Sequence, residues 1–257
     1  MVIDAHAHLT WRSPGTDWEA RDRSLIDAAD VLGIDRLCCS ILTPTRPSDP
    51  EGFRRANDWV CEAMDRFHDR VVGCCYVNPG YVREAREEIR RRIEDEGFIG
   101  VKLYNEYRAD EPVLFPLIEL CIDLEVPILQ HAGHSHYYVE RQPRMSNGVM
   151  IADLANRYPE ATIICGHLGG GGDWEFQIRA LRDAPGTYAD TSGSVIDEGM
   201  IEYAVQTLGA DRLLFACDMS MTAGVGKLRG AQISDAERRK IFGENMRSIL
   251  SARGEKL

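Results

Sequence analysis

The strongest constraint on the fold is an alternation, repeated eight times, between short apolar runs and longer amphipathic stretches. The short runs are nearly continuous in apolar residues, which is typical of strands buried on both faces of a parallel sheet. The expected strands are residues 2–7, 36–42, 71–77, 99–104, 126–131, 161–166, 187–192 and 212–217. The expected helices lie near residues 21–32, 52–68, 82–96, 113–124, 147–158, 174–183, 198–208 and 234–250.

This order predicts the fold class α/β and, within it, a (β/α)8 TIM barrel. Strands that alternate with helices form parallel sheets with right-handed crossovers, and eight such units can close on themselves. The chain of 257 residues has the usual length of one barrel and contains no Pro/Ser-rich linker, so we expect a single domain over residues 1–257. Longer loops are expected at 10–22, 105–112, 134–146 and 219–233, on the side where barrels build their active sites.

Composition limits the partners. The net charge of −11 disfavours nucleic acid, and no apolar run approaches the roughly 18 residues of a membrane span. The N-terminus lacks the basic and apolar segments of a signal peptide, so we expect a cytoplasmic protein that acts on a small molecule. The eight cysteines lack CxxC spacing and are expected to be free thiols; Cys165 and Cys217 fall beside the candidate site.

The first expected strand ends in a run that suggests a metal site. Asp4, His6 and His8 alternate along it, and alternate residues of a strand share one face, so all three are expected to point into the barrel. Two buried histidines can also be ordinary hydrogen-bonded core residues, so this pattern alone is weak.

Other polar residues make the pattern stronger. His131, His167 and Asp218 end the fifth, sixth and eighth expected strands, which places them at the same end of the barrel as His6 and His8. A purely structural role predicts no preference for one end, whereas barrel active sites are built at the carboxyl ends of the strands.

These residue types suit a divalent metal. Imidazole and carboxylate are ligands for Zn²⁺, Mn²⁺ or Fe²⁺, and His6, His8, His131 and Asp218 would leave room for a water or a substrate. Coordination lowers the pKa of water from about 15.7 to about 7, which provides a hydroxide nucleophile at neutral pH. His167 would then be available as a general acid or base.

Further candidates have more than one interpretation each. Asp4 orients a ligand histidine or bonds loop amides. Lys102 is carbamylated to bridge a second metal, pairs with a substrate carboxylate, or forms a structural ion pair. His134 and His136 contact substrate or are solvated, and Trp11 and Tyr104 line a pocket or simply pack.

The ordered set resembles the amidohydrolase superfamily, in the branch called amidohydrolase-related or amidohydrolase 2. That branch includes aminocarboxymuconate semialdehyde decarboxylase-like proteins. The resemblance covers essentially the whole chain and rests on motifs that begin at Ile3, Gly100, Val126, Cys165, Tyr188, Arg212 and Phe242.

The resemblance implies a role for each residue of the set. His6, His8 and His131 would be metal ligands, Asp218 a ligand or proton acceptor, and His167 the acid/base or substrate-polarising residue. Zinc would be the usual metal, with manganese also compatible. By analogy with such barrels, a homodimer is one assembly to expect.

Four functions remain open from the sequence. The leading one is hydrolysis of a small molecule by a metal-bound hydroxide, and its alternative is non-oxidative decarboxylation of a small carboxylic acid. A TatD-type deoxyribonuclease also opens with an HxH strand, but the chain has no glutamate between Gly100 and Tyr104, where that family has one. A barrel that keeps its metal for binding or regulation is the fourth.

Overall fold

The chain folds into a closed barrel of eight parallel strands. A computed structural model describes residues 1–44, 48–133 and 142–251, and its strands follow the order β1 to β8 around one sheet. The backbone amide of Ala5 donates to Phe215 O at 2.9 Å and that of Asp218 to His6 O at 2.7 Å, which joins the segment just after the last strand to the first strand. The strands are β1 Ile3–His8, β2 Arg36–Ser40, β3 Val71–Tyr76, β4 Gly100–Leu103, β5 Ile128–Gln130, β6 Ile163–Cys165, β7 Thr187–Asp190 and β8 Leu213–Leu214.

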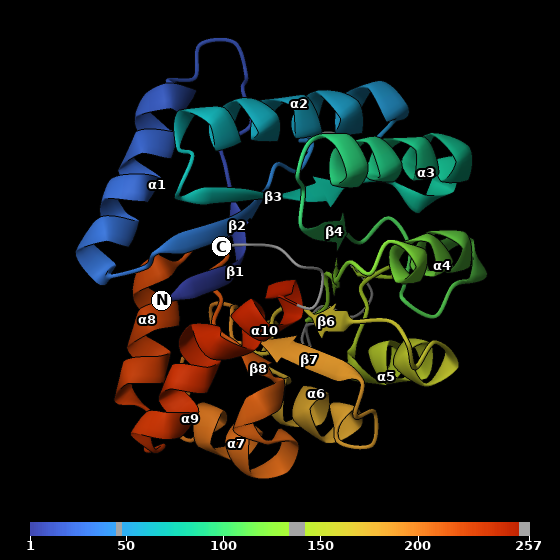
Figure 1. Ribbon diagram of the computed structural model, residues 1–257. Coiled ribbons are helices and arrows are strands. Elements are labelled where there is room, and N and C mark those ends of the chain that lie inside the picture. Colours follow the sequence, from blue (N-terminus) through green and yellow to red (C-terminus); the bar gives the residue numbers. More distant parts are fainter. Residues whose placement is uncertain (45–47, 134–141, 252–257) are drawn as a thin grey trace.

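Helices form a layer around these strands (Figure 1). They are α1 Trp18–Leu32, α2 Pro50–Arg66, α3 Val82–Arg90, α4 Phe115–Asp123, α5 Gly148–Arg157, α6 Trp174–Leu181, α7 Met200–Leu208, α8 Met221–Gly230, α9 Asp235–Arg239 and α10 Asn245–Ser251. The predicted (β/α)8 barrel is therefore confirmed, and every expected strand is present.

Two expected elements differ from the structure. Residues 219–233 were expected as a loop, but they contain α8, although three glycines lower the helix propensity of this segment. A Cβ on Gly224 would lie 2.8 Å from Cys217 Sγ, so this glycine lets α8 pack closely against the chain that follows β8. The expected helix 234–250 begins at the predicted capping box of Ser234 and Glu237, but a π-helical turn at Lys240–Glu244 divides it.

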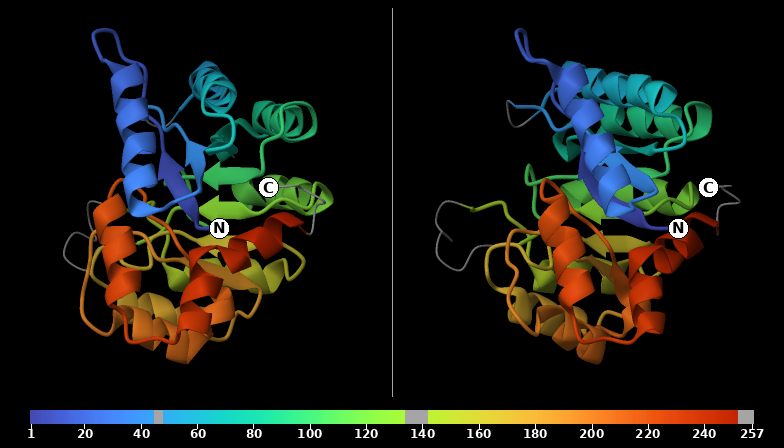
Figure 2. Two further views of the ribbon diagram at one scale, coloured as in Figure 1. Left: turned by 60° about the vertical axis from the view of Figure 1, so that its left-hand side comes forward. Right: turned by 90° about the vertical axis from the view of Figure 1, so that its left-hand side faces the viewer.

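The barrel has an inner and an outer apolar layer. The inner cluster takes Ile3, Cys38, Leu129 and other residues from strands all around the sheet, together with Met246 and Leu250 of α10. Because these residues come from opposite sides of the barrel, they fill its interior, and α10 covers the end at which the strands begin (Figure 2). The opposite end, where the strands finish, is left for polar residues.

All eight cysteines are free, as expected, and seven of them are buried. Burial raises the pKa of the Cys165 and Cys217 thiols well above the usual range, so these two remain protonated core groups beside the site. Within the described residues, no helix is both long and apolar enough to cross a membrane.

Candidate functional site

A β-bulge at the end of β1 aims its two histidines at the site. The pairing of β1 with β2 shifts register between Asp4 and Ala7, so the simple alternation assumed from the sequence is interrupted. Ala5 belongs to the inner apolar cluster and Ala7 to the outer one, although both have the same parity. The extra residue lets the imidazoles of His6 and His8 approach each other, with 3.2 Å between their Nε2 atoms.

Asp218 completes a compact group with these histidines. Its Oδ1 lies 3.3 Å from His8 Nε2. One donor atom each from His6, His8 and Asp218 falls within 4.8 Å of the others, which is a spacing that one metal ion can bridge. His6 is fully buried, whereas the side chain of Asp218 is 26% exposed, so the group is open on the Asp218 side.

His131 contacts His167. Its Nδ1 lies 2.9 Å from His167 Nε2, and the two rings meet edge to face with centroids 4.5 Å apart. Tyr104 covers the His131 ring at 4.1 Å, and His167 in turn lies 4.7 Å from the His6 ring. Among the described residues, His131 is thus adjacent to the group of His6, His8 and Asp218 but is not a member of it.

Backbone strain marks two of these residues. His167 has φ 62° and Asp218 has φ 54°, in the left-handed region that residues other than glycine rarely adopt. Each such conformation costs about 1–3 kcal/mol and persists where the surroundings impose it. Both residues lie a few positions after a strand, His167 after β6 and Asp218 after β8, at the end of the barrel where the site is.

Asp190, the last residue of β7, connects the site, and sequence reasoning gave it no role. Its Oδ2 accepts a hydrogen bond from His6 Nδ1 at 2.8 Å, and its Oδ1 accepts from the backbone amide of His167 at 3.0 Å. Its Oδ1 also lies 2.5 Å from Ser192 Oγ, which in turn lies 2.9 Å from His167 Nδ1. The available signal was an acidic residue in the second half of the expected strand 187–192, toward the end of the barrel where the other polar residues lie.

Asp4 bonds backbone amides. Its Oδ1 accepts from the amides of His6 and Cys217, both at 3.0 Å, and so connects the bulge in β1 to the segment that follows β8. Burial raises the pKa of Asp4 to about 7, against the opposing effect of these amides. Of its two interpretations, the structure supports a carboxyl that bonds backbone amides.

Lys102 lies inside the site. It is fully buried on β4, with Nζ 2.8 Å from His6 Nε2 and 6.0 Å from the centre of the Tyr104 ring. Its ammonium therefore faces the space into which the histidines point. His134 and His136, the two loop histidines considered from the sequence, lie outside the described residues.

His6, His131 and His167 are neutral and Asp190 and Asp218 are charged at neutral pH. Burial, reinforced by Lys102, lowers the pKa of His6 to about 3. Burial also lowers the pKa of His131 well below its usual value and that of His167 to about 4. For Asp190 and Asp218 burial acts in the opposite direction, but the neighbouring histidines outweigh it and hold both pKa values below the usual range. Neutral imidazoles and ionised carboxylates are the states that bind metals.

The loop that carries Ser192 packs directly on the loop that carries His167. Gly193 has φ +101°, and a Cβ there would lie 2.4 Å from the backbone carbon of Gly169. We expect Gly193→Ala to lower the free energy of unfolding by about 3–5 kcal/mol, since it adds backbone strain to a clash with main chain. Gly172→Ala is the control: it has φ +85° but nothing within 4 Å, and should cost only about 1–2 kcal/mol. Urea denaturation measures both, and equal losses would show that the loop contact has no importance.

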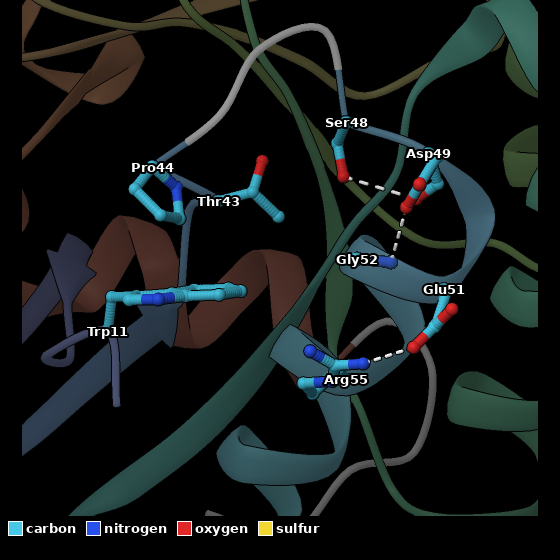
Figure 3. Close-up of a pocket in the computed structure, with 8 residues that line it drawn as sticks. All are labelled: Trp11, Thr43, Pro44, Ser48, Asp49, Glu51, Gly52 and Arg55. Carbon is cyan, nitrogen blue, oxygen red and sulfur yellow. Dashed lines mark hydrogen bonds and ion pairs between the residues drawn. The ribbon is translucent and has the colours of Figure 1, made fainter. Parts of the chain in front are cut away.

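A pocket of about 310 Å³ lies on the same face of the barrel. Trp11, three residues after β1, forms one wall, and Thr43 and Pro44, after β2, form another (Figure 3). The third wall is the start of α2, where Glu51 and Arg55 form an ion pair. Trp11 therefore lines a pocket, although its ring also packs edge to face on Trp59 at 4.7 Å.

This fold and site define a metallo-dependent hydrolase-type barrel. A sequence model described as amidohydrolase matches residues 3–250, so the chain belongs to the amidohydrolase family.

Curated relatives are decarboxylases by name. The gamma-resorcylate decarboxylase of Polaromonas sp. (strain JS666) is 25% identical over 301 aligned positions, which cover 92% of this chain and 91% of the relative. Because these positions outnumber the 257 residues of the chain, the relative carries several dozen residues without a counterpart here.

Solved structures share the fold. A crystal structure of 2,6-dihydroxybenzoate decarboxylase with 2,6-dihydroxybenzoate superposes with a TM-score of 0.76 at 20% identity, covering 98% of both chains. A dihydroxybenzoic acid decarboxylase from Polaromonas sp. JS666, with bound manganese and the inhibitor 2-nitroresorcinol, has a TM-score of 0.75 at 20% identity and covers 97% of this chain and 96% of its own.

Proposed function

We propose that this protein is a metal-dependent, non-oxidative decarboxylase of a small hydroxylated aromatic acid. One observation carries the proposal: the donor atoms of His6, His8 and Asp218 converge beside the buried ammonium of Lys102. The family relatives that match over nearly the whole chain are decarboxylases, which favours this activity over the hydrolysis that was the leading expectation from the sequence.

The donor set fits a divalent metal. His8 Nδ1 lies 3.2 Å from Ser40 O and 3.1 Å from Ser40 Oγ, so this nitrogen is held by Ser40 and Nε2 is the ring nitrogen that faces the site. Lys102 donates toward His6 Nε2, which therefore carries a lone pair. The Nε2 atoms of His6 and His8 and the Asp218 carboxylate thus converge, and one divalent cation could bind all three. His6, His8 and Asp218, with His131 as the proposed fourth ligand, would hold it.

The metal, when bound, would polarise oxygen atoms of the substrate as a Lewis acid. Zinc is expected from the sequence, and the manganese in a structural relative makes Mn²⁺ the first metal to compare with it. The neutral imidazoles and the carboxylate suit both ions.

The protein must also supply one proton. When the carbon–carbon bond to the carboxylate breaks, its electron pair stays on the ring carbon, CO2 leaves, and a proton takes its place. Asp218 is the partly exposed carboxylate of the site, and its Oδ2 lies 3.9 Å from His167 Nδ1. We assign the proton to these two residues, with His167 as the acid/base group and Asp218 as its partner toward the substrate.

Recognition of the acid would fall to two further residues. The Lys102 ammonium is placed to pair with an anionic oxygen of the substrate, and a charge-assisted bond in a buried site contributes about 1.5–3 kcal/mol. Trp11 offers an aromatic wall on the same face of the barrel. A buried cation and an aromatic side chain are the groups that would bind the carboxylate and the ring of an aromatic acid.

A direct comparison of reactions tests the proposal. Protein loaded separately with Mn²⁺ and Zn²⁺ is incubated with 2,6-dihydroxybenzoate and related hydroxybenzoates, and CO2 release is measured. The same preparations are given a panel of esters, lactones and amides, and single-stranded DNA. We expect CO2 release that stops with EDTA. Cleavage of the ester, lactone or amide panel without CO2 release would favour the hydrolase instead, and inertness toward every substrate would favour a binding protein.

A further inference from the structure

Asp190 and Ser192 have no role in the proposed reaction, but the hydrogen bonds of three site histidines lead to them, directly or through another histidine. Both are buried, with Asp190 0% and Ser192 1% exposed. Asp190 Oδ1 and Ser192 Oγ are only 2.5 Å apart. Asp190 Oδ1 already accepts from the backbone amides of His167 at 3.0 Å and Ser192 at 2.9 Å, so it is an acceptor, and the single hydroxyl proton of Ser192 lies between these two oxygens.

The position of the Ser192 proton determines which ring nitrogen of His167 is protonated. With its own proton directed at Asp190, Ser192 Oγ can only accept toward His167, whose Nδ1 lies 2.9 Å away. His167 therefore carries its proton on Nδ1 and presents a lone pair on Nε2. That lone pair lies 2.9 Å from His131 Nδ1, so His131 must be the donor in this contact.

The same carboxylate orients His6 from its other oxygen. Asp190 Oδ2 accepts from His6 Nδ1 at 2.8 Å, and Lys102 donates toward Nε2 of the same ring. Two chains of donors thus end on one side chain: His6 directly, and His131 through His167 and Ser192. In each case the histidine that is a proposed ligand has its proton on Nδ1 and its lone pair on Nε2.

We propose that Asp190 and Ser192 are positioning residues that set the tautomers of His6, His167 and His131, and so leave the Nε2 atoms of His6 and His131 available to a metal. The inference rests on the metal centre of the proposed function and not on decarboxylation. A partner of this kind fixes the tautomer and ring orientation of a ligand histidine, and its loss typically costs 10- to 100-fold in metal affinity.

The first test uses the wild-type chain. In ¹⁵N-labelled, Zn²⁺-loaded protein, long-range ¹H–¹⁵N correlation spectra report which ring nitrogen carries the proton. We expect His6, His131 and His167 to be protonated on Nδ1. A His167 protonated on Nε2 would overturn the proposal without any variant.

The second test removes the hydroxyl. In Ser192→Ala, His167 Nδ1 loses its acceptor, so the ring is free to move its proton to Nε2, which forces the tautomer of His131 to reverse. We expect His6 to keep its tautomer and Zn²⁺ affinity, measured by competition with a chelator, to fall about 10- to 100-fold. Ser192→Thr keeps a hydroxyl and should restore the wild-type tautomer of His167.

The matched control is Thr187→Ala, which removes a buried hydroxyl at the opposite end of β7. Thr187 Oγ1 donates to Ala184 O and accepts from Arg212, and this variant should keep Zn²⁺ affinity within about twofold of the wild type. An unchanged His167 tautomer and unchanged affinity in Ser192→Ala would refute the proposal. Since neither readout involves substrate, a chain that fails to release CO2 can still confirm it.

Discussion

Replacing His8 with alanine is expected to remove the bound metal and to lower the rate of CO2 release by at least about 1000-fold. His8 Nε2 faces both His6 Nε2 and Asp218 Oδ1, so its loss opens the group of donors on one side. A metal that polarises substrate oxygens contributes several kcal/mol, and about 4 kcal/mol corresponds to three orders of magnitude in rate. Elemental analysis and kcat/KM are measured on the same preparations.

The control for this variant is His68→Ala. His68 is the one described histidine away from the site, and its side chain is 74% exposed. It should keep the metal content and the rate of the wild type. A His8→Ala protein with full metal content and full rate would exclude His8 as a ligand. The number of metal ions bound per wild-type chain is also informative, because two ions would indicate that Lys102 is carbamylated and bridges them.

The metal-free protein is expected to lose stability steeply as pH falls below about 6.5. Burial holds the pKa of His6 at about 3 and of His167 at about 4, and that of His131 well below the usual 6.5. Below 6.5 these histidines gain protons in the unfolded chain but not in the folded one, so their contribution is complete above 6.5 and is lost as pH falls. Asp4 acts in the opposite direction: its folded pKa of about 7 favours folding at lower pH.

The three histidines change the free energy of unfolding with pH more than the carboxyl of Asp4 does. Near pH 5 the unfolded chain binds about two more protons than the folded one, which gives about 2.7 kcal/mol per pH unit. Between pH 7 and pH 5 we expect the free energy of unfolding to fall by about 3 kcal/mol, as measured by urea denaturation after EDTA treatment. His167→Gln should reduce this difference and His68→Ala should not. A free energy that rises toward pH 5 would show that the site histidines are not buried in their neutral form.

Added metal should oppose the loss of stability of the folded chain as pH falls. The ligand nitrogens bind a metal only when they are unprotonated, so saturating metal stabilises the folded chain most where the histidines are neutral. The pH at which the metal ceases to stabilise the protein then reports the titration of the same residues.

Much of this protein follows from sequence patterns. Apolar runs of strand length, separated by amphipathic stretches, predict a parallel barrel because only strands covered on both faces have that composition. Since all strands of such a barrel run in one direction, residues such as His6, His131 and Asp218 meet at one end whatever the details of the loops. Their positions could be predicted for that reason, and the family match over residues 3–250 agrees with it.

Other features depend on contacts between segments that are distant in the chain. The role of Asp190 is set by His6, 184 residues away, and by the turn that brings Ser192 against His167. Helix α8 forms on a glycine-rich segment because Gly224 fits against the chain after β8, which local propensity cannot indicate. The bulge that separates Asp4 from the histidines is likewise decided by pairing with β2. The sequence by itself determined the barrel and which end of it is polar, because both follow from local periodicity and strand direction. Only the tertiary structure decided which polar group orients which, because hydrogen bonds a few ångströms long depend on how separate loops pack.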